Sequence, residues 1–177
     1  MKFTAQMVPE AINNYNAYNG DGDRMIGVTG ETQLMEMVAR VVEISGAGIS
    51  GSYNAVVIGH FDSMTQTVNF RVLTKEGMVD LAPGKTVRLN LRGALQYKDS
   101  ATNESGEVGV RYVIGGQVRQ LSPGTLNPGN PMSASVQIDV TYALFEFDSE
   151  PCIEIDKLNS VYRVDGKDLM ENIRKLC

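Results

Sequence analysis

Residues 134–148, "ASVQIDVTYALFEFD", contain the longest clean alternation of apolar and polar side chains in the chain. In an extended strand, successive side chains point to opposite faces of the sheet. One face of this segment is therefore predicted to be apolar and the other polar. The apolar face comprises Val136, Ile138, Val140, Tyr142 and Leu144, and the polar face comprises Gln137, Asp139 and Thr141. The pattern predicts a strand with one side in a protein core.

Two other parts of the chain share this period of two. Residues 64–73 place Met64, Val68, Phe70 and Val72 on one face and Thr65, Thr67, Asn69 and Arg71 on the other. Residues 86–92 and 108–114 also alternate, and the polar turn "KDSATNESG" separates them. We expect these two segments to form a long antiparallel hairpin.

The remaining segments are shorter, and one is ambiguous. The turn "NGDGD" at 19–23 lies between 12–18 and 24–29 and predicts a hairpin. Residues 34–44 have helical spacing at their start but β-branched residues at their end, so both structures stay open. We further expect a short helix over 74–81, a last strand over 153–164, and a helix over 167–177 with Leu169, Ile173 and Leu176 on one stripe. Together these patterns predict one mainly antiparallel β domain over residues 1–177 with one or two short helices.

The composition excludes several classes of protein. The 16 basic and 21 acidic residues give a net charge of −5, whereas tight nucleic-acid binding needs an excess of Lys and Arg. No run approaches the 18 apolar residues of a membrane span, and the first residues lack the apolar region of a signal peptide. We therefore expect neither a membrane protein nor a secreted one. Cys152 and Cys177 are expected to be free thiols, as in a reducing cytoplasm.

The segment "GAGISG" at 46–51 matches the GxGxxG spacing of a dinucleotide-binding turn. Such a turn must open a helix and be followed by an acidic residue about 20 positions later. Here "SYNAVVIG" follows, which is β-branched and short, and no acid lies between Asp62 and Glu76. A structural glycine-rich loop is the better interpretation.

Three other partial motifs also lack their context. Gly84-Lys85-Thr86 resembles the end of a phosphate-binding loop, but a strand-like segment follows it where a helix is required. The acidic turn at 19–23 lacks the glycine and the bidentate Glu of a calcium loop. His60 is the only histidine and no CxxC pair is present, so a zinc site would be hard to complete. We predict no catalytic residue, cofactor or metal, and therefore no enzyme.

Four stretches, 8–31, 44–64, 72–96 and 153–176, carry a family resemblance that spans nearly the whole chain. The most specific features are Gly59-His60-Phe61 and the ending "DGKDLMENIRKL" at 165–176. On these residues the chain resembles the major tail tube proteins of contractile-tailed bacteriophages, a family shared with the tubes of phage-tail-like bacteriocins. Met35 and Asp165 differ from residues that are common in that family. The resemblance favours extended strand and loop over residues 34–44.

The resemblance implies an antiparallel β-sandwich or barrel-like fold whose sheet is completed across the subunits of a hexameric ring. Stacked rings of this kind enclose a channel, and sharing strands between subunits protects the exposed sheet edges. Glycine-rich backbone can lie close to a neighbour, so we predict that residues 45–61 form a loop that crosses to an adjacent subunit or ring. The predicted contact residues are Gly46, Gly48, Ile49, Gly51, Tyr53, Gly59, His60 and Phe61. The predicted lumen-facing residues are Thr65, Thr67, Asn69, Arg71, Gln137, Asp139 and Thr141, unless these form the ordinary solvated face of a monomeric sandwich.

The implied function is structural. The expected partners are further copies of the chain, a tail sheath, a baseplate or tube initiator and a tail terminator, with DNA only as non-specific cargo and no membrane. The expected location is the virion tail, assembled in the cytoplasm of the host bacterium. If part of the acidic excess lines the channel, repulsion would keep DNA from sticking during ejection. Alternatives are the tube of a bacteriocin or injection system without DNA, a ligand- or glycan-binding β-sandwich, and a nucleotide-dependent enzyme.

Overall fold

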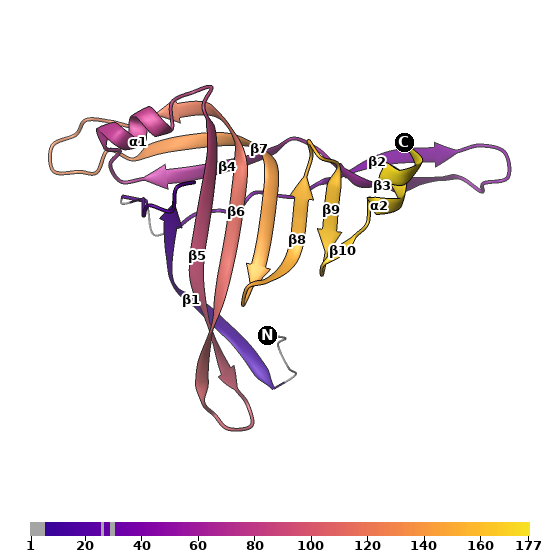
Figure 1. Ribbon diagram of the computed structural model, residues 1–177, viewed down its shortest axis with the longest axis horizontal. Coiled ribbons are helices and arrows are strands. Elements are labelled where there is room, and N and C mark those ends of the chain that lie inside the picture. The colour runs from indigo at the N-terminus through magenta and orange to yellow at the C-terminus, as the bar shows by residue number, and fades with distance from the viewer. Residues whose placement is uncertain (1–5, 26, 29–30) are drawn as a thin grey trace.

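The strand predicted from alternation over 134–148 is β7 (Ala134–Phe147), which pairs with β4, β6 and β8. The computed structural model describes residues 6–25, 27–28 and 31–177. Its main sheet has the order β1-β5-β6-β7-β8-β9-β10, and β4 also pairs with β7 (Figure 1). The other strands of this sheet are β1 (Met7–Tyr18), β4 (Met64–Phe70), β5 (Thr86–Asp99), β6 (Ser105–Ser122), β8 (Glu150–Asp156), β9 (Val161–Val164) and β10 (Lys167–Asp168). All of their pairings are antiparallel, and the mainly β prediction is confirmed.

The core lies under β4 and the first half of β7. Both strands bury every second residue there, and Val68 and Ile138 have no exposed surface. The predicted long hairpin is also confirmed, because β5 and β6 pair continuously from Thr86 opposite Gln117 to Lys98 opposite Ser105. The predicted apolar faces form the core as far as Phe70 in β4 and Val140 in β7, as alternation in a half-buried sheet requires.

The alternation in β7 does not continue to its end. Ala143 is 1% exposed, whereas Tyr142 and Leu144, which were predicted for the core face, are only half-buried. The register explains the change, because Gly115 and Gly116 of β6 lie opposite Tyr142 and Val140, which leaves Thr141 as an extra residue in a β-bulge. A bulge shifts the strand by one position and moves the following side chains to the other face. Gly116 has no side chain to collide with the Asp139 carbonyl, which approaches it closely here.

The apolar face of β4 ends one alternation earlier than predicted. The strand stops at Phe70, and Val72 is 47% exposed, so its predicted place in the core is wrong. The backbone bends there because the Arg71 N–H donates to the Gly27 carbonyl at 2.7 Å. Leu73 enters the core instead. The predicted short helix follows as α1 (Lys75–Asp80), with the Thr74 hydroxyl capping its first turn.

The segment predicted as one strand over 153–164 consists of two strands with a turn between them. Asp156 ends β8, and its carboxylate accepts the backbone N–H groups of Leu158 and Asn159 at 3.1 and 3.0 Å. Ser160 takes a positive φ of 51° before β9 returns antiparallel to β8. An aspartate that binds the backbone two and three residues ahead favours a turn over a continued strand.

The predicted hairpin around 19–23 is present only at its turn. The Asn19 side chain accepts the N–H groups of Asp21 and Asp23, and Arg24 forms a single bridge with Tyr18. Val28 pairs with Phe70 instead of with β1, so the return strand predicted over 24–29 is wrong in the part that the structure describes. Ile26 and Thr29 of that prediction lie outside the described residues.

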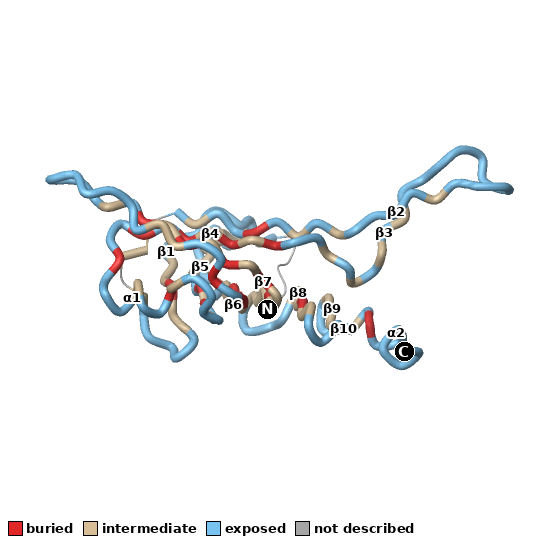
Figure 2. Tube along the Cα trace, turned by 90° about the horizontal axis from the view of Figure 1, so that it is seen from above, coloured by how far each residue is buried: buried red, intermediate tan, exposed pale blue. Residues whose placement is uncertain are grey.

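A second sheet consists of β2 (Ala39–Ser45) and β3 (Ser52–Phe61), which pair only with each other. This hairpin, called the arm below (residues 39–61), projects from one end of the molecule in both views (Figures 1 and 2). Residues 31–38 lead into it without regular structure, which confirms extended chain over 34–44. The chain ends in α2 (Glu171–Leu176), and neither α1 nor α2 is long and apolar enough to span a membrane.

Candidate functional site

The arm exposes apolar side chains on both of its faces. Val41 lies opposite Val56 on one face, and these side chains belong to residues that are 52% and 60% exposed. Val42 lies opposite Ala55 and Ile44 lies opposite Tyr53 on the other face. Figure 2 shows the contrast with the central strands, where the buried residues gather. Contiguous exposed apolar surface of this kind marks an interaction site.

The glycines of the "GAGISG" motif form the turn at the tip of the arm. Gly48 and Gly51 have φ values of +89° and +98°, which glycine adopts without steric cost. The Ile49 N–H closes the turn on the Gly46 carbonyl at 3.1 Å. Only residues 46–51 lie outside the strands, so the loop predicted over 45–61 is too long, and Tyr53, Gly59, His60 and Phe61 belong to β3.

The base of the arm packs against the C-terminal segment. The Phe61 ring meets the Tyr162 ring edge-on, with 5.0 Å between the centroids. Lys157 donates from Nζ to the Asp62 carbonyl at 2.6 Å. Gly59, with φ +75°, leaves space for the side chain of Met170, which a Cβ at this position would overlap. His60, between Gly59 and Phe61, is exposed. The eight predicted contact residues therefore divide into two groups. Gly46, Gly48, Ile49, Gly51 and Tyr53 lie at or beside the tip, and Gly59, His60 and Phe61 lie at the base.

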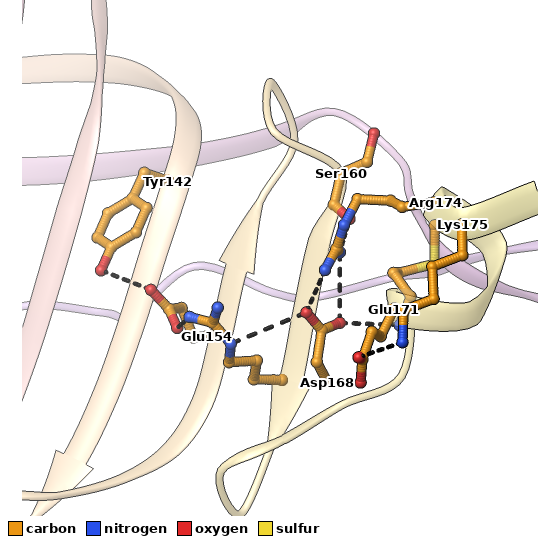
Figure 3. A network of polar contacts seen from close by, with 9 residues as sticks. Tyr142, Glu154, Ser160, Asp168, Glu171, Arg174 and Lys175 are labelled. Carbon is orange, nitrogen blue, oxygen red and sulfur yellow. Dashed lines mark hydrogen bonds and ion pairs between the residues drawn. The ribbon is translucent and has the colours of Figure 1, made fainter. Parts of the chain in front are cut away.

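A network of charged and polar side chains lies on β7–β10 and α2, next to the base of the arm (Figure 3). The Tyr142 hydroxyl donates to Glu154 at 3.1 Å, and Arg163 donates to the other carboxylate oxygen of Glu154 at 2.6 Å. Arg174 of α2 binds Asp168 at 2.5 Å and the Ser160 carbonyl at 2.7 Å. The hydrogen bond from Arg174, with one from the Met170 N–H, holds the pKa of Asp168 below its usual range. Asp168 is therefore a carboxylate at neutral pH.

The predicted lumen-facing residues form a polar strip on the outer face of β4 and β7. Thr65 lies opposite Asp139 and Thr67 lies opposite Gln137, so these side chains share one face, and Asn69 continues the row beside Ser135. Thr141 lies in the bulge at one end of the strip, and Arg71 follows the end of β4. The structure thus brings the strip together at its centre.

The negative charge of Asp139 on this strip has a positive neighbour. Arg119 of β6 lies 3.4 Å from the Asp139 carboxylate and donates to the Gln137 side chain at 3.0 Å. Both charged residues are about half exposed, so their pairing contributes little to stability, but it offsets the negative charge of Asp139. The strip presents mainly hydroxyl and amide groups.

Two buried features were missed by the sequence analysis. Gln66 has no exposed surface and binds residues 33–35, since it donates from Nε2 to the Gln33 carbonyl at 2.8 Å and accepts the Met35 N–H at 3.0 Å. It interrupts the apolar face between Met64 and Val68, and a polar residue at a core position of an alternating strand could have indicated it. Met170, which is 5% exposed, gave no such signal because its role depends on Gly59 in a distant segment.

No group of three or more His, Cys, Asp or Glu side chains is arranged to hold a metal among residues 6–25, 27–28 and 31–177. The dinucleotide interpretation of "GAGISG" has no helix to support it, because a strand follows the turn. The segment after Gly84-Lys85-Thr86 is likewise strand β5. The arm and the polar strip are therefore the features that need a functional explanation.

Comparisons with known proteins agree with this geometry. The family model described as phage tail tube protein FII matches residues 9–176. The tail tube protein of Escherichia phage P2 is 23% identical over 150 residues, which cover 84% of this chain and 86% of that protein. A chain from the sheath/tube terminator of an extracellular contractile injection system has a similar fold, with a TM-score of 0.53 at 9% identity, over 78% of this chain and 96% of that one. The chain belongs to the phage tail tube protein FII family, a family of structural proteins of the phage tail.

Proposed function

We propose that this chain forms hexameric rings that stack into the hollow tube of a contractile phage tail, through which DNA passes into the host. The observation that carries the proposal is the arm, where Val41, Val42, Tyr53, Val56 and Ile58 are 45–60% exposed within the described chain. An isolated two-stranded hairpin is only marginally stable in water. The arm therefore needs a surface of another molecule.

A second copy of the chain is the partner that fits best. The arm projects from one end of an elongated molecule (Figure 1), so an arm that contacts a different part of its neighbour makes a head-to-tail contact. Contacts of this type close into rings or continue as filaments. A tube of stacked rings uses both arrangements, and a tail tube family is where such a subunit is expected.

The free sheet edges support this role for the arm. The outer edge of β1 contains Pro9, which has no N–H, and its pairing with β5 has irregularities near Pro9 and Ile12. Such features discourage pairing with a further strand. The arm has a register shift between Ala39 and Val41 at its base, but it pairs regularly from Val41 to Ser45 and has no proline. Its edges are suited to contact with another chain.

The polar strip is the proposed lining of the channel. Its centre presents threonine hydroxyls and amides, and Arg119 there lies beside Asp139, so Arg71 at one end is the exposed positive charge among the predicted lumen-facing residues. Weak attraction to phosphates suits a conduit, since binding of DNA rests on Lys and Arg contacts. Repulsion by further acidic residues in the channel stays a prediction.

Electron microscopy of the purified chain tests assembly directly. Wild type at high concentration is expected to form hollow rods or six-fold rings. Val56→Lys places a charge on the exposed arm and is expected to abolish them, because burial of an unpaired charge is costly. Gly48→Val and Gly51→Val are expected to do the same by changing the tip, where φ is positive.

The matched control is Val79→Lys on α1, which is 53% exposed and lies far from the arm (Figure 1). It is expected to assemble as wild type does. Featureless particles from wild type, or normal tubes from Val56→Lys and both glycine variants, would contradict the proposal. Terminase and capsid genes beside the coding region would separate a phage tube from a bacteriocin tube that carries no DNA.

A further inference from the structure

The two stretches with the most specific sequence signatures meet in the structure. Gly59 and Phe61 lie at the base of the arm and contact Met170 and Tyr162. Asp165 and Gly166, with φ of 49° and 75°, turn the chain so that the C-terminal segment runs back to this contact. These segments are more than 100 residues apart in the sequence, so their contact connects the arm to the end of the chain.

Met170 is held in place by Asp168 and Arg174. The Met170 N–H donates to Asp168 Oδ1 at 2.9 Å, and the Leu169 N–H donates to the Tyr162 carbonyl at 2.9 Å. Arg174 joins Asp168 to the Ser160 carbonyl, which belongs to the β8–β9 turn of the main sheet. Arg163 of β9 lies 3.9 Å from the same carboxylate. These contacts therefore fix the position of Met170 relative to the main sheet.

We propose that the Asp168–Arg174 pair is a positioning device that sets the direction in which the arm leaves the body. It acts through Met170, whose side chain fills the space beside Gly59. This inference rests on the proposed function, since a fixed arm direction matters only if the arm must reach a neighbouring copy.

Because the arm is long, a small rotation at its base moves its tip by a large distance. The ten residues of β3 span about 33 Å at the usual rise of a strand. A rotation of about 10° at the base then moves the tip by roughly 6 Å, which is more than the spacing between neighbouring strands. An arm that samples the productive direction only about a tenth of the time would bind its neighbour about tenfold more weakly.

The test variant is Asp168→Asn, which keeps an oxygen for the Met170 N–H but removes the charge that binds Arg174. The matched control is Glu171→Gln, which removes the same charge from the neighbouring Glu171–Lys175 pair, where both side chains are more than half exposed. Both residues of that pair belong to α2, and Figure 3 shows the bond between their side chains. Arg174→Lys, which keeps the charge but loses the two-point contact, should give an intermediate result.

The first readout is the distance between spin labels at Ser50→Cys in the arm tip and Gln120→Cys in β6, with Cys152 and Cys177 replaced by Ser. In the dispersed subunit, Asp168→Asn is expected to broaden or shift this distance distribution, whereas Glu171→Gln is expected to leave it unchanged. The second readout is the minimum concentration for tube formation, which should rise about tenfold in Asp168→Asn. A subunit with an unchanged label distance would overturn the inference.

The two readouts separate this inference from the proposed function. If wild type forms no tubes, the proposed function fails, but the label distance still tests the positioning role. If wild type forms tubes and Asp168→Asn forms them at the same concentration with a broadened label distance, the arm direction does not limit assembly and the inference fails. A general loss of folding in Asp168→Asn would also count against it, and thermal unfolding followed by circular dichroism detects that case.

Discussion

Strands β4 and β7 and the arm use similar side chains in opposite ways. Val68 and Ile138 in the main sheet have no exposed surface, whereas Val56 and Ile58 in the arm are 60% and 54% exposed. Both regions contain β-branched residues in antiparallel strands, so neither residue type nor strand geometry explains the difference in exposure. The main sheet covers its apolar face with its own chain, whereas the proposed function assigns the cover of the arm to a neighbouring copy. The proposed assembly would therefore place most of the folding energy in the main sheet and the assembly energy in the arm.

The largest effect is expected where the chain covers itself. Phe70, which is 2% exposed, ends the buried face of β4. Phe70→Ala should lower the free energy of unfolding by about 3–5 kcal/mol, because it removes a buried ring and leaves a cavity. Chemical denaturation followed by circular dichroism measures this. Val72→Ala, only two residues away but 47% exposed, should change it by less than about 0.5 kcal/mol. Equal losses in both variants would contradict the assigned end of the core.

Gln66 should give an intermediate effect. Its side chain binds Gln33 and Met35, and it accepts the Tyr112 hydroxyl at 3.4 Å. Gln66→Leu keeps the bulk but leaves these buried groups without a partner, which should cost about 1–3 kcal/mol of unfolding free energy. Hydrogen exchange at the Met35 amide should become faster in the same variant.

The control for Gln66→Leu is Thr67→Val, which lies on the polar strip of the same strand and is half-buried. It should leave both the unfolding free energy and the Met35 exchange rate close to wild type. If Gln66→Leu is as stable as wild type, residues 31–38 are held by contacts other than this side chain.

The parts of the fold that the sequence predicted are those governed by local periodicity. Alternation indicated β4, β5, β6 and β7 because each strand is half-buried and the period is two. The core face predicted for β7 is wrong from Tyr142 onward, because the register with β6 shifts there. A pair of consecutive glycines, Gly115 and Gly116, was the available signal for a bulge, since glycine within a strand often marks one. The turn in "DKLNS" at 156–160 also had its Asp, Asn and Ser in the sequence.

The candidate site was harder to predict because its parts depend on distant contacts. The glycines at the arm tip were recognised as structural, but β3 was taken for loop, since its apolar residues have no visible core to face. The meeting of Gly59 with Met170 joins two ends of the chain and leaves no local pattern. Alternation grouped the residues at the centre of the polar strip, whereas the contact of Arg119 with Asp139 depends on the neighbouring strand β6, and the lumen-facing role of the strip stays a prediction.

The smallest effect on folding is expected in the arm, and it completes the comparison. Val56 is 60% exposed, so Val56→Lys removes little buried surface from the dispersed subunit. Its free energy of unfolding, measured below the concentration at which wild type assembles, should stay within about 0.5 kcal/mol of wild type. The same variant is expected to form no tubes, so folding and assembly separate at a single residue. A loss of more than about 1 kcal/mol in the dispersed subunit would mean that the arm packs on its own body, and the division between the two regions would then be wrong.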